Sequence, residues 1–450
     1  MTTTPETGTA VASEPELSRA IALPHATAMV VGTIIGASIF VQPSEITGRV
    51  PSVSGIFLVW AVSGVLTLFG ALVCAELTTV FPKSGGVYVF LRESFGRPLG
   101  FLWGWAMFWT MHSGIIAAIA VVFARYVGFF VPLGDGALRA VAITAILLLS
   151  FVNVLGVKHG SVLQTLFTAG KLLAIVLIVA VGFALGGSVP DAALRPDAPP
   201  GQPWGLGDFA LALVAGLFAF GGWHMVTYSA GETVDPRRTI PRALAIGVAV
   251  VTLCYIALNA VYLYVLPLDT VAASTRIAAD AAERVLGPGA GAAVSGLVIF
   301  STFGALAGIV LAGPRVYYAM AKDGLLFRWM GSVHPVRRTP VLAIALQAFW
   351  SSVLVATGTY GELFRRVVYT EWIFFGLLAV GLFLLRRRGA ERTYSIWGYP
   401  FVPAIFALGA FAIALNQIAA EPRDSMIGLG LVVIGLPVYW IWTRFRTSNP

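Results

Sequence analysis

Residues 32–40 read GTIIGASIF, and residues 216–229 read GLFAFGGWHMVTYS. Each stretch lies near the middle of a long apolar segment and places glycines beside small polar residues. Glycine weakens a helix interior. Glycine-interrupted apolar segments at corresponding positions in two halves of a chain are the best sequence indication of a site formed by broken membrane helices. These two stretches therefore predict an all-helical membrane protein with two interrupted helices.

The composition supports a membrane protein. The 450 residues are 58% hydrophobic and 11% charged, with a mean hydropathy of +0.86, whereas soluble chains carry about 25% charged residues. Apolar runs of about 20 residues match the thickness of a bilayer core, and the short alternating segments of a membrane barrel are not seen. The net charge of +8 does not indicate nucleic acid binding, because the basic residues fall in alternate loops. Cys74 and Cys254 lie inside apolar runs and are interpreted as packing residues.

Twelve membrane spans are predicted from the apolar runs. We expect them at residues 20–46, 53–78, 98–131, 137–156, 161–186, 207–232, 241–266, 289–321, 340–357, 364–385, 399–419 and 425–443. With the N-terminus in the cytoplasm, cytoplasmic segments hold nineteen Lys and Arg residues and outer segments hold eight. This asymmetry predicts that both termini are cytoplasmic.

The interrupted helices also suggest what the site binds. An unwound turn frees backbone N–H and carbonyl groups near the bilayer midplane, and helix N-termini favour a carboxylate. Freed carbonyls suit an ammonium group, so a break in each half can hold a zwitterion without a charged side chain. The alternative is that the glycines serve close helix packing, which is the better explanation for one glycine pair but not for two corresponding clusters.

Several motifs resemble the amino acid–polyamine–organocation superfamily, and most closely its L-type amino acid transporter branch and related bacterial permeases. The motifs are GTIIGASIF at 32–40, EL at 76–77, PKSGG at 82–86, FTAGK at 167–171, FAFGGW at 218–223, the loop residues Glu232, Pro236, Arg237, Ile240 and Pro241, GPR at 313–315 and DG at 323–324. The resemblance runs from about residue 20 to residue 443. Where relatives carry Ser-Gly, this chain has Ala37 and Ser38; His224 and Ala307 stand where relatives often have Asn, so the substrate does not transfer with the resemblance.

The resemblance implies a fold and a set of site residues. The fold is a five-plus-five inverted repeat of the leucine-transporter type, with broken helices one and six and two extra C-terminal helices, working by alternating access. The substrate carboxylate would be bound at Ile35, Gly36, Ala37 and Ser38. The amino group would be bound by carbonyls at Ile34, Phe218, Ala219 and Gly221, with Phe218 also an aromatic gate.

Three side chains inside predicted spans have roles that the residues leave open. Lys171 lies deep in span five, where a charge is costly and a functional role is expected. The resemblance implies that it bridges to span one in a coupling or conformational role, with a structural tether as the alternative. His224 is predicted to line the pocket, the alternative being a hydrogen-bonded packing histidine. Glu371 is a candidate for an outer gate or for a structural role.

The sequence thus predicts a secondary transporter in the plasma membrane, a permease or exchanger for an amino acid. A carrier of the same fold for a polyamine, nucleobase or other small organic solute remains an alternative, whereas the reactive cluster of a membrane enzyme and the features of a channel are not seen. Besides the substrate and membrane lipid, no nucleic acid, cofactor, metal or disulfide-linked accessory subunit is expected, and the oligomeric state is left open. We expect a disordered cytoplasmic tail at 1–18, a ten-helix core at 19–398 with halves 19–190 and 206–390, two additional helices at 399–443 and a cytoplasmic tail at 444–450.

Overall fold

The computed structural model describes residues 17–36, 38–186, 204–358 and 360–447, without the side chains of 360–368 and 445–447. The described residues form helices joined by short loops, because a chain that crosses lipid must satisfy its backbone hydrogen bonds internally. Up to residue 186 the helices are α1 (Leu23–Ile34), η1 (Ser38–Phe40), α2 (Gln42–Arg49), α3 (Val53–Val80), α4 (Val87–Phe95), α5 (Arg97–Ala106), η2 (Met107–Met111), α6 (His112–Phe130), α7 (Asp135–Leu155) and α8 (Val157–Gly186).

The remaining helices follow from residue 204. They are α9 (Leu206–Ala219), η3 (Trp223–Glu232), α10 (Pro236–Val265), α11 (Leu268–Ala273), α12 (Ile277–Leu286), α13 (Ala290–Ala312), α14 (Pro314–Lys322), η4 (Arg328–Gly331), α15 (Val341–Thr357), α16 (Tyr360–Arg387), α17 (Phe401–Ala420), α18 (Pro422–Val433) and α19 (Gly435–Thr447). The segment η2 is a π-helical turn, and η1, η3 and η4 are 3-10 helices.

Eleven helical segments of the described chain are long and apolar enough to cross a membrane. The ninth expected span corresponds to α15, which is apolar but only 17 residues long because Gly358, with a φ of +74°, ends it. The seventh span begins earlier than expected, at Pro236, where the missing N–H of proline costs nothing in a first helical turn. The prediction of an all-helical membrane protein is confirmed; of the twelve expected spans, eleven are long enough among the described residues and α15 is a shorter apolar helix.

Both predicted interruptions are present. The helix α1 ends at Ile34, and Ile35 has an extended conformation with a ψ of 93° before η1 begins at Ser38. The helix α9 ends at Ala219, and the turn Phe220–Gly222 precedes η3. Gly222 has a φ of +98°, which favours glycine. The glycine clusters therefore mark the points where both helices break.

Helices at corresponding positions in the two expected halves pack against one another. The second span, α3, contacts the seventh, α10; the third, α6, contacts the eighth, α13; and α1 contacts η3 of the sixth. The fifth span, α8, packs against both α1 and α13. This pairing agrees with the inverted repeat that the resemblance implies, and it buries the two breaks in the middle of the bundle.

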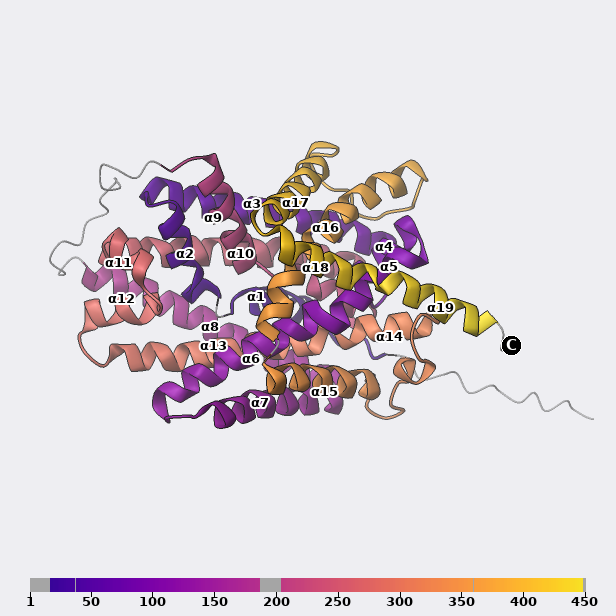
Figure 1. The fold of residues 1–450 in the computed structure, drawn as a ribbon, viewed down its shortest axis with the longest axis horizontal. Coiled ribbons are helices and arrows are strands. Elements are labelled where there is room, and N and C mark those ends of the chain that lie inside the picture. The colour runs from indigo at the N-terminus through magenta and orange to yellow at the C-terminus, as the bar shows by residue number, and fades with distance from the viewer. Residues whose placement is uncertain (1–16, 37, 187–203, 359, 448–450) are drawn as a thin grey trace, which may run out of the picture.

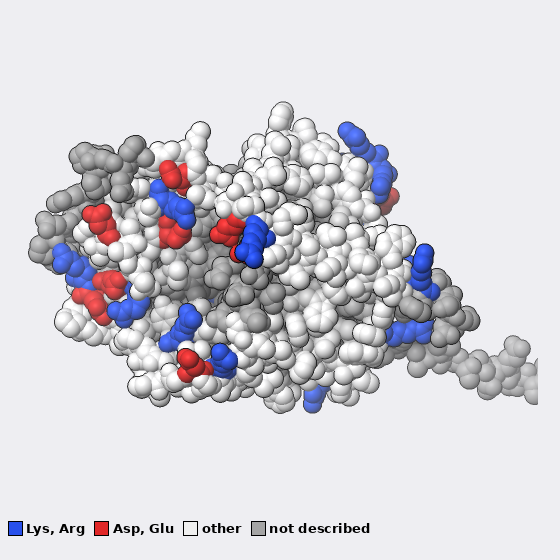
Figure 2. All heavy atoms as spheres, in the orientation of Figure 1, with Lys and Arg blue, Asp and Glu red and all other residues white. Residues whose placement is uncertain are grey.

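The surface fits a protein surrounded by lipid. Many of the long helices, such as α7, α10 and α13, run along the horizontal axis of Figure 1, with α11 and α12 at the left end and α4 and α14 toward the right end, near the C-terminus. Most charged side chains visible in Figure 2 lie toward the two ends of this axis. Large apolar side chains such as Phe151, Leu166 and Leu173 are exposed on α7 and α8, as expected where lipid replaces water.

Candidate functional site

The two breaks touch each other at Gly222 and Thr33. A Cβ atom added to Gly222 would lie 3.2 Å from the carbonyl oxygen of Thr33. The Thr33 hydroxyl lies 2.7 Å from the carbonyl oxygen of Met29 and 3.3 Å from that of Gly222. The absence of a side chain at Gly222 therefore allows the broken sixth helix to lie directly against the first.

Tyr255 of α10 joins the two breaks through one hydroxyl group. Its oxygen lies 2.9 Å from the carbonyl oxygen of Ala219 and 3.1 Å from that of Ile34. These are the last residues of α9 and α1, whose carbonyls have no intrahelical partner. The buried phenol thus brings two helix C-termini to the same point. Since a carbonyl oxygen can accept two hydrogen bonds, each can still bind a donor from a ligand.

Lys171 of α8 contacts the end of α1. Its Nζ atom donates hydrogen bonds to the carbonyl oxygens of Gly32, at 2.8 Å, and Ile35, at 2.7 Å. The side chain is 2% exposed. A helix C-terminus carries partial negative charge, so the ammonium group and the end of α1 stabilise each other.

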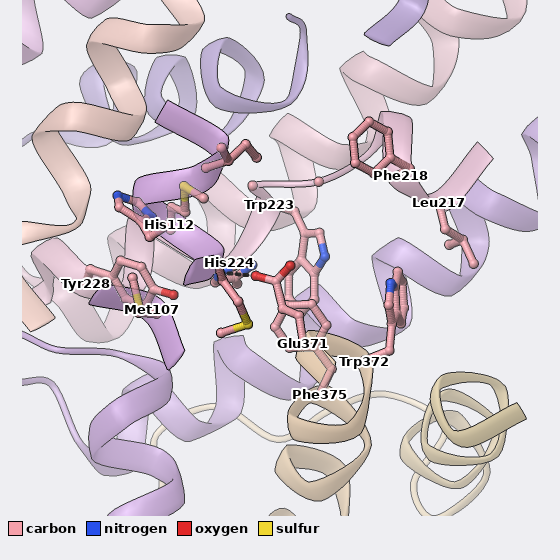
Figure 3. Close-up of a pocket in the computed structure, with 15 residues that line it drawn as sticks. Met107, His112, Leu217, Phe218, Trp223, His224, Tyr228, Glu371, Trp372 and Phe375 are labelled. Carbon is pink, nitrogen blue, oxygen red and sulfur yellow. Dashed lines mark ion pairs between the residues drawn. The ribbon is translucent and has the colours of Figure 1, made fainter. Parts of the chain in front are cut away.

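A cavity lies beside the break of the sixth helix. It is lined by η2 and the start of α6, by the turn between α9 and η3, and by α16 (Figure 3). Phe218 lines it from the end of α9, Gly221 lines it at the turn, and His224 and Tyr228 line it on η3. Gly221 faces open space, since only the Phe218 carbonyl oxygen, at 3.1 Å, is near an added Cβ atom.

His224 and Glu371 face each other across this cavity. The Nε2 atom of His224 lies 3.6 Å from a carboxylate oxygen of Glu371 (Figure 3). His224 is 1% exposed, and neither of its ring nitrogens has a hydrogen-bond partner. The rings of Phe375 and Trp223 lie 4.8 and 5.4 Å from the imidazole, centroid to centroid. The cavity therefore combines aromatic walls with two ionisable groups that lack strong partners.

The residues predicted for the site fall into two groups. Phe218, Gly221, His224 and Glu371 line the cavity. The other predicted residues that the structure describes are not among its lining residues, and neither is any described residue of α1 or η1. Ile34, Ile35, Gly36 and Ala219 are buried, Ser38 is half-buried, and Ala37 lies outside the described residues. An added Cβ atom at Gly36 would contact Ala305 of α13 at 3.4 Å.

Sequence reasoning missed two features of the site. Tyr255 gives no sequence signal, because it lies in an apolar helix and its role depends on which carbonyls it reaches. The π-helical turn η2 brings Met107 and Met111 to the cavity wall; the unusual length of the third span was the available hint. His112, which follows η2, also lines the cavity while its Nε2 atom lies 3.0 Å from the carbonyl oxygen of Ile309.

Ion pairs between buried or partly buried side chains connect the helices at the end of the molecule that carries α14. Arg315 of α14 makes a bidentate pair with Glu232 at the end of η3, at 2.6 and 2.9 Å, and both side chains are fully buried. Arg386 of α16 makes a second bidentate pair with Glu76 of α3, at 2.7 and 2.6 Å. Arg92 and Tyr88 of α4 both contact Asp323. These pairs connect the ends of the broken sixth helix and of its neighbours.

Comparison with known proteins gives consistent matches along nearly the whole chain. The family model described as amino acid permease matches residues 21–440. A serine/threonine exchanger of Bacillus subtilis is 32% identical over 437 residues, which are 96% of this chain and 98% of the relative. The human large neutral amino acids transporter small subunit 2 is 32% identical, covering 94% of this chain and 80% of the relative. The mouse b(0,+)-type amino acid transporter 1 is 30% identical, covering 96% and 89%.

Proposed function

Because this chain belongs to the amino acid permease family, we propose that it exchanges amino acids across the cell membrane by alternating access. Its relatives are named as transporters and exchangers, so amino acid transport is its activity and it is not an enzyme.

The observation that carries the proposal is the meeting of two helix ends at Tyr255. The carbonyl oxygens of Ile34 and Ala219 share the single proton of its hydroxyl, and each oxygen has a second lone pair. A substrate ammonium group bound there would be stabilised by two helix C-termini, which carry partial negative charge. Phe218 and Gly221, at the same break as Ala219, line the neighbouring cavity.

The substrate carboxylate is assigned to the other side of the first break. The segment from Ile35 to Ser38 leads into η1, where backbone N–H groups at a helical N-terminus favour an anion. Gly36 leaves room for a carboxylate to approach the backbone, and Ser38 adds a hydroxyl. Binding a zwitterion therefore requires no charged side chain of the protein.

Lys171 is proposed to hold the first break in its present conformation. Its contacts to Gly32 and Ile35 connect α8 to the end of α1. A rearrangement of α1 relative to α8 has to break these bonds or move both helices together. The lysine thus links substrate binding at the break to movement of the bundle.

The chain is a multi-pass membrane protein. We propose that it lies in the plasma membrane with both termini on the cytoplasmic side. The loops at the end with α4 and α14 carry most of the Lys and Arg residues, which favours the cytoplasmic side. The buried pair of Glu232 and Arg315 then lies on the inner side of the site. Residues 19–190 and 206–390 form the two halves of the transport core in this proposal, with residues 399–443 added to it.

Counterflow in proteoliposomes tests the function. Purified protein is reconstituted in vesicles loaded with one unlabelled amino acid, and uptake of labelled amino acids is measured in turn. We expect saturable uptake that discriminates L from D isomers and depends on the internal amino acid. Absence of exchange with all twenty common amino acids, together with uptake of a polyamine or nucleobase, would instead support a carrier for another solute.

A further inference from the structure

We infer that Glu371 and His224 make the cavity select amino acids whose side chain ends in a cation. The inference rests on the proposed transport function and adds the substrate class. It is carried by three observations on the described residues of the cavity: the charge balance, the unpartnered polar atoms and the aromatic walls.

The charge balance of the cavity favours a positive ligand. Among its described lining residues Glu371 is the one acid, and none is Lys or Arg. Lys171 does not compensate it, because its ammonium group is engaged with Gly32 and Ile35. The nearest basic group is His224 at 3.6 Å, which is too long for a hydrogen bond. The Glu371 side chain is 23% exposed and lines the cavity, and a carboxylate with little water around it is costly unless it is paired. A ligand cation would provide that pair.

Two further polar groups of the cavity are placed to accept hydrogen bonds. Both ring nitrogens of His224 and the hydroxyl of Tyr228 are buried without partners, and both residues line the cavity. A neutral imidazole offers one acceptor nitrogen, and the phenol oxygen offers lone pairs. An ammonium or guanidinium group has several N–H donors. It can therefore bond Glu371, His224 and Tyr228 together, whereas an apolar side chain would leave all three unpaired.

The walls around these groups suit a cation as well. The rings of Trp223, Tyr228 and Phe375 surround the imidazole of His224, at centroid distances from 4.8 to 5.5 Å. Trp372 lines the same cavity on α16, next to Glu371 (Figure 3). A cation near aromatic faces is stabilised by about 0.5–2 kcal/mol depending on desolvation. A hydroxyl side chain could bond one acceptor but would leave the carboxylate without a counter-charge, and an acidic side chain would be repelled.

Lysine and norleucine provide a matched pair of ligands, because they differ only in the terminal ammonium group. We expect wild-type protein in proteoliposomes to take up lysine with a kcat/KM at least tenfold above that of norleucine. The same preference should appear as a larger rise in Tm of the purified protein with lysine than with norleucine. Wild-type protein that exchanges norleucine or serine as well as lysine would overturn this inference and leave amino acid transport standing. Failure to exchange any amino acid would overturn the proposed function itself.

Variants of Glu371 and His224 test whether these two residues cause the preference for lysine over norleucine. Glu371→Gln keeps the size of the side chain and removes its charge, and should lower the ratio of lysine to norleucine exchange at least tenfold. His224→Asn removes the imidazole acceptor and should lower the ratio less. Glu421→Gln is the control, since Glu421 is an exposed glutamate outside the cavity, and should keep the wild-type ratio. An unchanged ratio in folded Glu371→Gln protein would contradict the assignment.

Discussion

The Nζ atom of Lys171 lies 2.7 Å from the carbonyl oxygen of Ile35, the first residue after α1 and the point at which the helix is interrupted. A second hydrogen bond, to Gly32, spans the last turn of the same helix. A charged side chain deep in a membrane protein is kept only where its environment compensates the charge. Here the compensation comes from the free carbonyls of a buried helix C-terminus, so these hydrogen bonds offset both the cost of burying Lys171 and the cost of breaking α1.

Replacing Lys171 by alanine should reduce amino acid exchange by at least about tenfold, because two charge-assisted hydrogen bonds of about 1.5–3 kcal/mol each are lost. The measurement is counterflow in proteoliposomes, normalised to the amount of reconstituted protein. Lys158→Ala is the matched control, since Lys158 lies on the same helix with its side chain exposed. Equal exchange by the Lys171 and Lys158 variants would show that the lysine is not needed for transport.

Tyr255→Phe should raise the KM for the exchanged amino acid about fivefold, the equivalent of one hydrogen bond of about 1 kcal/mol. The variant removes the hydroxyl that joins Ile34 and Ala219 while keeping the ring that packs against Trp60 and Phe220. Tyr262→Phe is the control on the same helix, because the Tyr262 hydroxyl is buried without a partner. A similar KM for the two variants would remove Tyr255 from the binding site.

The helical architecture could be predicted from the sequence because apolar length and glycine position act locally. Apolar runs of membrane length gave the spans, and the glycines of 32–36 and 221–222 gave the positions of both breaks. The short α15 and the early start of α10 differ from the expected spans because Gly358 and Pro236 set those helix ends, and the apolar runs do not resolve such effects.

The contacts of the site could be predicted only in part. A role for the buried Lys171 was expected from the cost of its charge, and its place near the first break was implied by the resemblance, but the choice of Gly32 and Ile35 as its acceptors depends on the rotation of α8 against α1. That His224 lies opposite Glu371 depends on how η3 packs against α16, and this packing is set by the whole bundle. The role of Tyr255 could not be predicted for the same reason, because its hydroxyl can join two helices only where their ends meet.

Glu232→Gln should lower the Tm of the purified protein by on the order of 5–10 °C, because removing one charge of a buried pair costs several kcal/mol. The Arg315 guanidinium would remain buried, with the carbonyl of Leu311 as a remaining acceptor. Asp235→Asn is the control three residues away, where the exposed pair with Arg238, at 3.7 Å, should contribute little. A Tm for Glu232→Gln as high as that of Asp235→Asn would mean that the buried pair does not stabilise the fold.

Gly222→Ala should reduce exchange by about tenfold or more, because an L-residue in a left-handed conformation costs about 1–2 kcal/mol and the added methyl group presses on the other break. Gly222 has a φ of +98°, and its new Cβ atom would lie 3.2 Å from the Thr33 carbonyl oxygen. Relieving that contact must move the sixth helix away from the first and separate the carbonyls that Tyr255 holds together. Gly207→Ala, in the same membrane span, meets open space and should exchange within twofold of wild type. Size-exclusion profiles of both variants report whether they fold, and wild-type exchange by folded Gly222→Ala protein would show that the close approach of the two breaks is not required for transport.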